Sequence, residues 1–169
     1  KRGTDGKIEA IKYARNNKIP FLGICYGMQM AIIEFARNKL NLKKATSSEF
    51  DKKGLHIIGL LNEWTKDGKK IKGTDKDLGG TMRLGSYDAK LKENSMIRKI
   101  YKKNLIKERH RHRYEVNIAY KEKFEKNGMD FSGLSPDGLL PEIIELKNHP
   151  WFIGVQFHPE FKSRPLAPH

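Results

Sequence analysis

A cysteine flanked by glycines is the residue whose setting points most directly to chemistry. Cys25 is the only cysteine in the 169-residue chain and stands between Gly23 and Gly27 in the stretch FLGICYGMQM, residues 21–30. A glycine two residues before and two after a nucleophile is typical of the sharp turn that joins a strand to a helix. We expect such a turn to hold Cys25 in a strained backbone conformation, and a side chain at either glycine to collide with neighbouring backbone.

The position of Cys25 at a predicted helix N-terminus bears on its reactivity. Unpaired N–H groups and the helix dipole favour a thiolate, so the sequence predicts a pKa below the usual value of about 8.5. The alternative is a buried structural cysteine, because a free cysteine packs like a small apolar residue. Since a nucleophile needs a base, the histidines decide between the two.

The stretch QFHPEF contains the histidine with the most informative neighbours, His158. In an extended segment, residues i and i+2 project to the same side, and Pro159 would stiffen the link to Glu160. Glu160 could then accept the ring N–H and leave the other ring nitrogen towards the thiol, which makes a Cys-His-Glu triad. The alternatives are a satisfied histidine at a strand end and an exposed acid.

The remaining histidines lack that arrangement; they are His56, His110, His112, His149 and His169. His110 and His112 alternate as metal ligands might, but no second cysteine or aspartate cluster accompanies them. We therefore expect no metal site.

The hydrophobic pattern around Cys25 predicts the elements that position it. Apolar residues at helical spacing predict helices over residues 6–17 and 27–39, and the apolar run at residues 19–24 predicts a strand covered on both faces. This order predicts an α/β fold with a mostly parallel central sheet flanked by helices.

Further elements follow along the chain. HIIGLL is strand-like, residues 94–103 and 118–127 have helical spacing, and residues 40–53 and 62–77 are polar and irregular, the latter a predicted surface loop. The late segments DFSGLS, EIIELK and WFIGVQFHPEF are strand-like and closely spaced, which predicts antiparallel strands added to the core. No repeat or internal boundary divides residues 1–169, so we expect one domain.

Composition excludes several classes of protein. The net charge of +14 could indicate nucleic-acid binding, but the lysines are scattered through every segment and favour a basic solvated surface. No stretch approaches the roughly 20 apolar residues of a membrane span. One cysteine makes no internal disulfide and no signal-peptide pattern opens the chain, so we expect a cytoplasmic location.

Several motifs together resemble a known family. GICYGMQ followed late in the chain by HPE is similar to the class I glutamine amidotransferases, and GGTMRLG, ERHRHRYEVN and QFHPEFKSRP resemble the C-terminal glutaminase domain of the CTP synthases. The resemblance extends from KRGTDGK to the last residue. It implies a flavodoxin-like amidotransferase fold whose opening strands, oxyanion loop and synthase domain precede this chain, so an isolated fragment would be weakly active or inactive.

By that resemblance, Cys25 attacks the side-chain amide of glutamine, and His158, oriented by Glu160, protonates the departing ammonia. Glu49 would bind the α-ammonium of L-glutamine and Arg113 its α-carboxylate, while Gln29 and the Tyr26 backbone complete the pocket.

Each of these substrate-binding assignments has an alternative. Glu49 could be a solvated acid, and Gln29 a surface residue of its helix. RHRHR could be an exposed stripe or a phosphate contact, with Arg109, Arg111 and Arg113 on one side of a strand. Tyr26 also stands where the family more often has leucine, which bears on the pocket wall.

The resemblance also implies the partners of the whole enzyme. The glutaminase domain needs no cofactor, and ammonia passes to a synthase domain of the same chain, where ATP and Mg²⁺ activate UTP for amination to CTP. GTP is the allosteric activator, IKGTDKD and GGTMRLG lie where the family responds to it, and the full-length enzyme forms a homo-tetramer. The alternatives are another class I amidotransferase, such as a GMP synthetase type, and a basic nucleic-acid-binding module.

Overall fold

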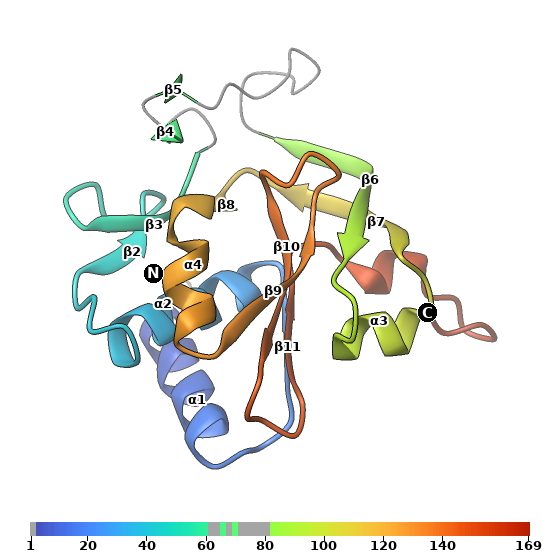
Figure 1. Ribbon diagram of the computed structural model, residues 1–169, viewed down its shortest axis with the longest axis horizontal. Coiled ribbons are helices and arrows are strands. Elements are labelled where there is room, and N and C mark those ends of the chain that lie inside the picture. The colour runs from blue at the N-terminus through green and yellow to red at the C-terminus, as the bar shows by residue number, and fades with distance from the viewer. Residues whose placement is uncertain (1–2, 61–64, 67–68, 71–81) are drawn as a thin grey trace.

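The computed structural model describes residues 3–60, 65–66, 69–70 and 82–169 (Figure 1). Its helices are α1 (Thr4–Asn16), α2 (Tyr26–Asn38), α3 (Met96–Tyr101) and α4 (Lys121–Lys126), with 3₁₀ turns η3 (Ile118–Tyr120) and η4 (Pro159–Lys162). Its strands are β1 (Phe21–Ile24), β2 (Ala45–Ser47), β3 (Leu55–Gly59), β4 (Thr65–Lys66), β5 (Lys69–Lys70), β6 (Arg83–Leu91), β7 (Leu105–His112), β8 (Glu115–Val116), β9 (Met129–Leu134), β10 (Pro141–Leu146) and β11 (Phe152–Val155).

The main sheet has six strands in the order β1-β11-β10-β9-β6-β7. Strands β1 and β11 pair in parallel, with Ile24 beside Val155, and the other neighbours are antiparallel. The predicted α/β fold and the late antiparallel strands are confirmed. The sheet is mixed and more antiparallel than the pattern indicated, because short connections such as that between β9 and β10 join antiparallel neighbours.

Two apolar cores cover the two faces of this sheet. Helices α1 and α2 lie beside the strands β1 and β11 in Figure 1, and Phe152 packs in their core. Ile153 and Val155 point to the opposite face, where they pack in a second core with Ile97 of α3. Because β11 is buried on both faces, its carboxyl end is held firmly at the site that follows it.

Helix α2 packs against both the main sheet and α1. Nine of its consecutive residues, from Met28 to Ala36, are buried, including the apolar residues predicted to face the core. Its Glu34 is fully buried and accepts two hydrogen bonds from the Arg15 guanidinium of α1, at 2.7 and 2.9 Å. A bidentate pair of this kind fixes the orientation of the two helices as well as their distance.

Three sequence expectations need correction or fall outside the described residues. Leu22 is 48% exposed, so β1, at the edge of the sheet, is not covered on both faces as predicted. Residues 40–53, predicted to be irregular, contain β2, a strand too short for its pattern to be visible. Most of the predicted loop at 62–77, with IKGTDKD and the first residues of GGTMRLG, lies outside the described residues. Among the helices that are described, none is both long and apolar enough to cross a membrane.

Candidate active site

The turn between β1 and α2 presents Cys25 at a strained elbow. Strand β1 ends at Ile24, α2 begins at Tyr26, and Cys25 between them has φ 50° and ψ −100°. Its backbone N–H donates to the Val155 carbonyl at 2.7 Å, and its own carbonyl accepts from Gln29 N–H at 3.2 Å. These bonds, to β11 and to the helix, hold a conformation that a non-glycine residue rarely adopts.

The two flanking glycines play different parts. A Cβ at Gly23 would lie 2.8 Å from the carbonyl carbon of Gly27 and 2.9 Å from the backbone nitrogen of Met28, so only glycine fits there. A Cβ at Gly27 would have no neighbouring atom within 4 Å, because it would point into open space. The predicted collision is therefore confirmed at Gly23 and wrong at Gly27.

The sulfur of Cys25 is a protonated thiol at neutral pH. Burial raises its pKa to about 11, and the negative charges of Glu115 and Glu160 act in the same direction. The Tyr26 backbone N–H and the Gln156 side chain lower the pKa but do not offset burial. The predicted lowering of the pKa is wrong, because desolvation outweighs the N–H groups of the helix start.

The predicted contact between His158 and Glu160 is present. His158 Nδ1 lies 2.7 Å from Glu160 Oε1, and within the described part of the chain His158 Nε2 is buried without a hydrogen-bond partner. The Phe161 ring stacks on the imidazole at 4.6 Å between centroids. The backbone differs from the expected extended segment, since β11 ends at Val155 and Pro159–Lys162 forms a 3₁₀ turn that brings the two side chains together.

Cys25 and His158 follow the carboxyl ends of two neighbouring strands. Ile24 and Val155 are partners in the parallel pair β1 and β11, so the residues that follow both strands emerge side by side. The carboxyl ends of adjacent parallel strands are where α/β proteins most often bind ligands. The charge of Glu160 acts on the pKa of Cys25, which places the His158–Glu160 pair within electrostatic reach of the sulfur.

Gln29 lies one helical turn beyond Cys25 and points inward. It is 3% exposed, and its Nε2 donates to the Tyr114 carbonyl at 2.9 Å and to Gln156 Oε1 at 3.2 Å. Gln29 is therefore not a surface residue of its helix. Tyr26 is half-buried at the start of α2, and a 2.9 Å hydrogen bond joins its hydroxyl to Thr4 in α1.

The two predicted charged ligands of the substrate lie in connecting segments. Glu49 is half-buried just after β2, and its backbone N–H donates to the Ser47 hydroxyl at 3.2 Å. Arg113 is exposed in the bend after β7, directly before the Tyr114 carbonyl that binds Gln29. Arg109 and Arg111 are exposed on β7, and Arg113 is exposed just beyond it, so all three arginines of the predicted stripe are exposed although the strand ends before Arg113.

A buried charged cluster, which sequence reasoning missed, includes Glu115, whose charge acts on the pKa of Cys25. Arg83 pairs with Glu115 at 3.2 Å and with Glu142 at 2.8 Å. Burial raises the pKa of Glu142 to about 7, although Arg83 opposes the shift. No local pattern indicated this cluster, because its three members come from the separate strands β6, β8 and β10.

The two histidines of that stretch are also buried. His110 Nδ1 lies 2.9 Å from His112 Nε2, and burial, with Arg83 nearby, lowers their pKa values to about 2 and about 3. Both rings are therefore neutral near pH 7. Among the residues that the structure describes, no group of three His, Cys, Asp or Glu side chains could hold a metal ion.

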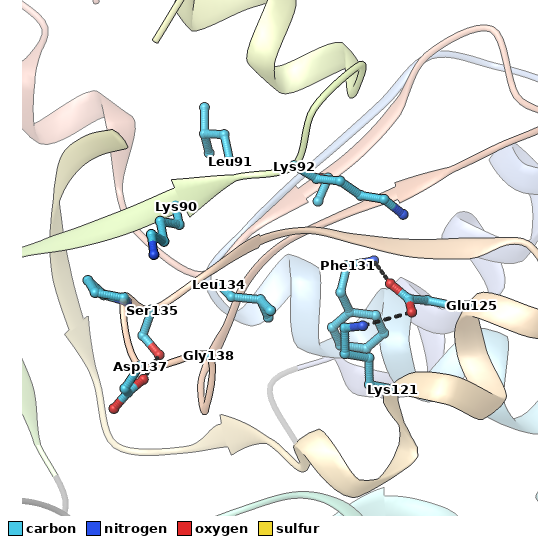
Figure 2. Close-up of a pocket in the computed structure, with 12 residues that line it drawn as sticks. Lys90, Leu91, Lys92, Lys121, Glu125, Phe131, Leu134, Ser135, Asp137 and Gly138 are labelled. Atoms are coloured by element: carbon cyan, nitrogen blue, oxygen red, sulfur yellow. Dashed lines mark hydrogen bonds and ion pairs between the residues drawn. The ribbon is translucent and has the colours of Figure 1, made fainter. Parts of the chain in front are cut away.

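A cavity of about 480 Å³, whose lining does not include Cys25, lies between β6, β9 and α4 (Figure 2). Its wall includes Lys90 of β6, Phe131 of β9 and Lys121 of α4, whose ammonium pairs with Glu125 at 2.8 Å. None of the predicted site residues lines this cavity.

Comparison with known proteins decides the family. The family model described as glutamine amidotransferase class-I matches residues 1–169, the whole chain. The chain belongs to the class I glutamine amidotransferase family. It is 90% identical over 169 residues to a CTP synthase of Pelagibacter ubique (strain HTCC1062) and 62% identical to a CTP synthase of Zymomonas mobilis. It spans 31% of the length of each.

Solved structures agree with this membership. The amidotransferase chain is similar to the Trypanosoma brucei CTPS glutaminase domain with bound acivicin, with 38% identity and a TM-score of 0.86, covering 99% of this chain and 62% of that one. A glutamine amidotransferase from Thermotoga maritima, 14% identical with a TM-score of 0.52 over 92% of this chain and 46% of that one, shares the fold. The predicted fold class and the resemblance to the CTP synthase glutaminase domain are confirmed.

Proposed function

We propose that this amidotransferase domain hydrolyses L-glutamine and supplies the ammonia to the synthase domain of a CTP synthase. The observation that carries the proposal is a strained Cys25 elbow beside the His158–Glu160 pair, in a chain 90% identical to a CTP synthase across its whole length. In the proposed catalytic triad Cys25 is the nucleophile, His158 the acid and base, and Glu160 the group that orients the imidazole.

The first half-reaction begins with a proton transfer. Because burial raises the pKa of Cys25 to about 11, the resting thiol needs a base, and the unpartnered Nε2 of His158 accepts its proton. The sulfur then attacks the amide carbon of glutamine and forms a tetrahedral oxyanion. His158 gives the proton to the amide nitrogen, the C–N bond breaks, and ammonia leaves a glutamyl thioester on Cys25.

The second half-reaction regenerates the enzyme. Water gives a proton to His158 as its oxygen attacks the thioester carbon, and the C–S bond breaks to release glutamate. The proton on His158 returns to the Cys25 sulfur. Glu160 Oε1, 2.7 Å from His158 Nδ1, stabilises the imidazolium that forms in each half-reaction.

Four residues are proposed to hold the substrate. Glu49 would pair with the α-ammonium of glutamine, and the planar guanidinium of Arg113, exposed in its bend, would take the α-carboxylate through two hydrogen bonds. Gln29 and the Tyr26 backbone would contact the side-chain amide. Their support is the position of Gln29 one turn after Cys25 and its bond to the Tyr114 carbonyl next to Arg113.

The whole enzyme extends the proposal beyond this domain. Ammonia would pass inside the protein to the synthase domain, where UTP activated by ATP with Mg²⁺ accepts it and gives CTP, with GTP as allosteric activator. The glutaminase domain itself would use no cofactor. A homo-tetramer in the cytoplasm is the proposed working form of the full-length protein, and filaments of it are a further form.

Enzyme assays of the full-length protein test this function. Cys25→Ala should abolish glutamine-dependent CTP formation, a loss of at least about 10³-fold, and leave ammonia-dependent CTP formation intact. His158→Gln should behave in the same way. His56→Gln is the matched control, because His56 is not a member of the triad. Its Nε2 lies 2.7 Å from the Asp51 carbonyl, and the variant should keep both activities.

Two outcomes would replace the proposal with an alternative. Amination of xanthosine monophosphate in place of UTP would assign the domain to a GMP synthetase-type enzyme. Salt-dependent binding to DNA or RNA that Cys25→Ala leaves unchanged, without glutaminase activity, would assign it to a nucleic-acid-binding module. Similarity across the full chain to two CTP synthases favours neither alternative.

A further inference from the structure

Gln156 is a buried polar residue that lies between the proposed nucleophile, Cys25, and Gln29 of α2. It follows β11 directly, is 0% exposed, and precedes His158 by two residues. We propose that Gln156 is a positioning residue for glutamine hydrolysis, whose carboxamide holds the Cys25 sulfur at one end and the Gln29 side chain at the other. This inference rests on the proposed function of Cys25.

A chain of hydrogen bonds carries the inference. Gln156 Nε2 donates to Cys25 Sγ at 3.6 Å, and Gln156 Oε1 accepts from Gln29 Nε2 at 3.2 Å. Gln29 Nε2 also donates to the Tyr114 carbonyl at 2.9 Å. The carboxamide of Gln156 thus uses one donor and one acceptor to join the sulfur to the helix residue one turn beyond it.

The main sheet holds this hydrogen-bonded relay, Cys25–Gln156–Gln29, in place. The Gln156 backbone N–H donates to the Glu142 carbonyl of β10 at 2.8 Å, and the next residue, Phe157, is fully buried. The side chain therefore cannot turn to solvent without breaking a packed core. A buried amide of this kind is retained only when its hydrogen bonds are satisfied, because an unmade bond leaves the group desolvated without a partner.

The relay has one consequence at each end. Both N–H groups of the Gln29 amide are donated inward, so its carbonyl oxygen is the atom that can face the amide of glutamine. At the other end, a donor to sulfur stabilises the thiolate more than the thiol. This donor opposes the burial and the charges of Glu115 and Glu160, which raise the pKa of Cys25.

Substitution by methionine tests the relay in the full-length protein. Gln156→Met keeps the length and approximate volume of the side chain and removes both hydrogen bonds. A lost bond to an ionised partner predicts a fall in kcat/KM for glutamine of about tenfold to hundredfold. The pH midpoint for alkylation of Cys25 by iodoacetamide, measured by peptide mass spectrometry, should rise by about one unit or more.

A second variant separates the two ends of the relay. The ionised carboxylate in Gln156→Glu can still accept from Gln29 but cannot donate to the sulfur, so its alkylation midpoint should rise as well. Ile153→Val is the matched control, because it thins the packing of β11 on the opposite face and leaves the relay intact. The control should keep the wild-type midpoint, and the thermal unfolding transition of the glutaminase domain, followed by calorimetry in every variant, reports whether that domain is folded.

The outcomes distinguish this inference from the function on which it rests. A wild-type midpoint and wild-type kcat/KM in folded Gln156→Met, together with an inactive Cys25→Ala, would overturn the role of Gln156 and leave the glutaminase proposal standing. A midpoint that moves equally in Ile153→Val would also overturn it, since general packing would then explain the shift. Glutaminase activity retained in Cys25→Ala would overturn both.

Discussion

Alanine at Gly23 should destabilise the elbow, and the structure gives the size of the effect. The added Cβ would lie 2.8 and 2.9 Å from two backbone atoms of α2, about 0.5 Å or more inside the 3.4–4 Å of ordinary van der Waals contact. Backbone at a strand-to-helix turn yields less than a flexible side chain, so we expect the upper end of the overpacking range, about 3 kcal/mol. For a chain of this length that lowers Tm by about 6–12 °C.

Gly27→Ala is the matched control four residues further on. No atom lies within 4 Å of the added Cβ, and the residue is in the first turn of α2. Alanine there should be neutral or raise the free energy of unfolding by up to about 1 kcal/mol, since glycine is the poorer helix former. Differential scanning calorimetry of the two variants gives the comparison. Equal Tm values would refute the assignment of the close approach to Gly23.

Three further predictions concern the charges around the site. Glu160→Gln should lower kcat for glutamate release by about 10²-fold to 10⁴-fold, because a carboxamide cannot stabilise the His158 imidazolium. A wild-type rate would contradict the role of Glu160 in orienting and stabilising His158. Arg83→Met should lower the free energy of unfolding, measured by urea titration, by about 3–5 kcal/mol, because it leaves the buried Glu115 and Glu142 without their shared cation. A loss under about 1 kcal/mol would show that other groups compensate the two carboxylates. The pKa of Glu142 rises from 4.5 to about 7 in the folded state, so between these pH values the folded protein holds a proton that the unfolded chain has lost. The free energy of unfolding should therefore decline as pH increases from 4.5 to about 7. Glu142→Gln should remove that decline, and an unchanged pH dependence would argue against the raised pKa.

Local pattern was sufficient to predict the elbow and the elements beside it. The apolar run before Cys25, the glycine spacing and the helical periodicity after it are all short-range signals, and they predicted β1, α2 and the turn between them. The contact of His158 with Glu160 was predicted from a separation of two residues, although the backbone there is a 3₁₀ turn.

Long-range burial was not visible in the sequence. The pKa of Cys25 depends on desolvation and on Glu115, which lies far along the chain, so the local helix effect gave the wrong direction. Gln156 and Arg83 were missed for the same reason, because their partners come from different strands. The mixed sheet also depends on which strands meet, a property that no single segment encodes.

Covalent labelling tests the central claim most directly. The full-length protein is treated with a glutamine-analogue electrophile, with and without excess glutamine, and the modified peptide is identified by mass spectrometry. The account predicts one adduct, on the Cys25 sulfur, which glutamine suppresses and which removes glutamine-dependent but not ammonia-dependent CTP formation. An adduct at another residue, or labelling of Cys25 that leaves glutamine-dependent synthesis unchanged, would contradict it.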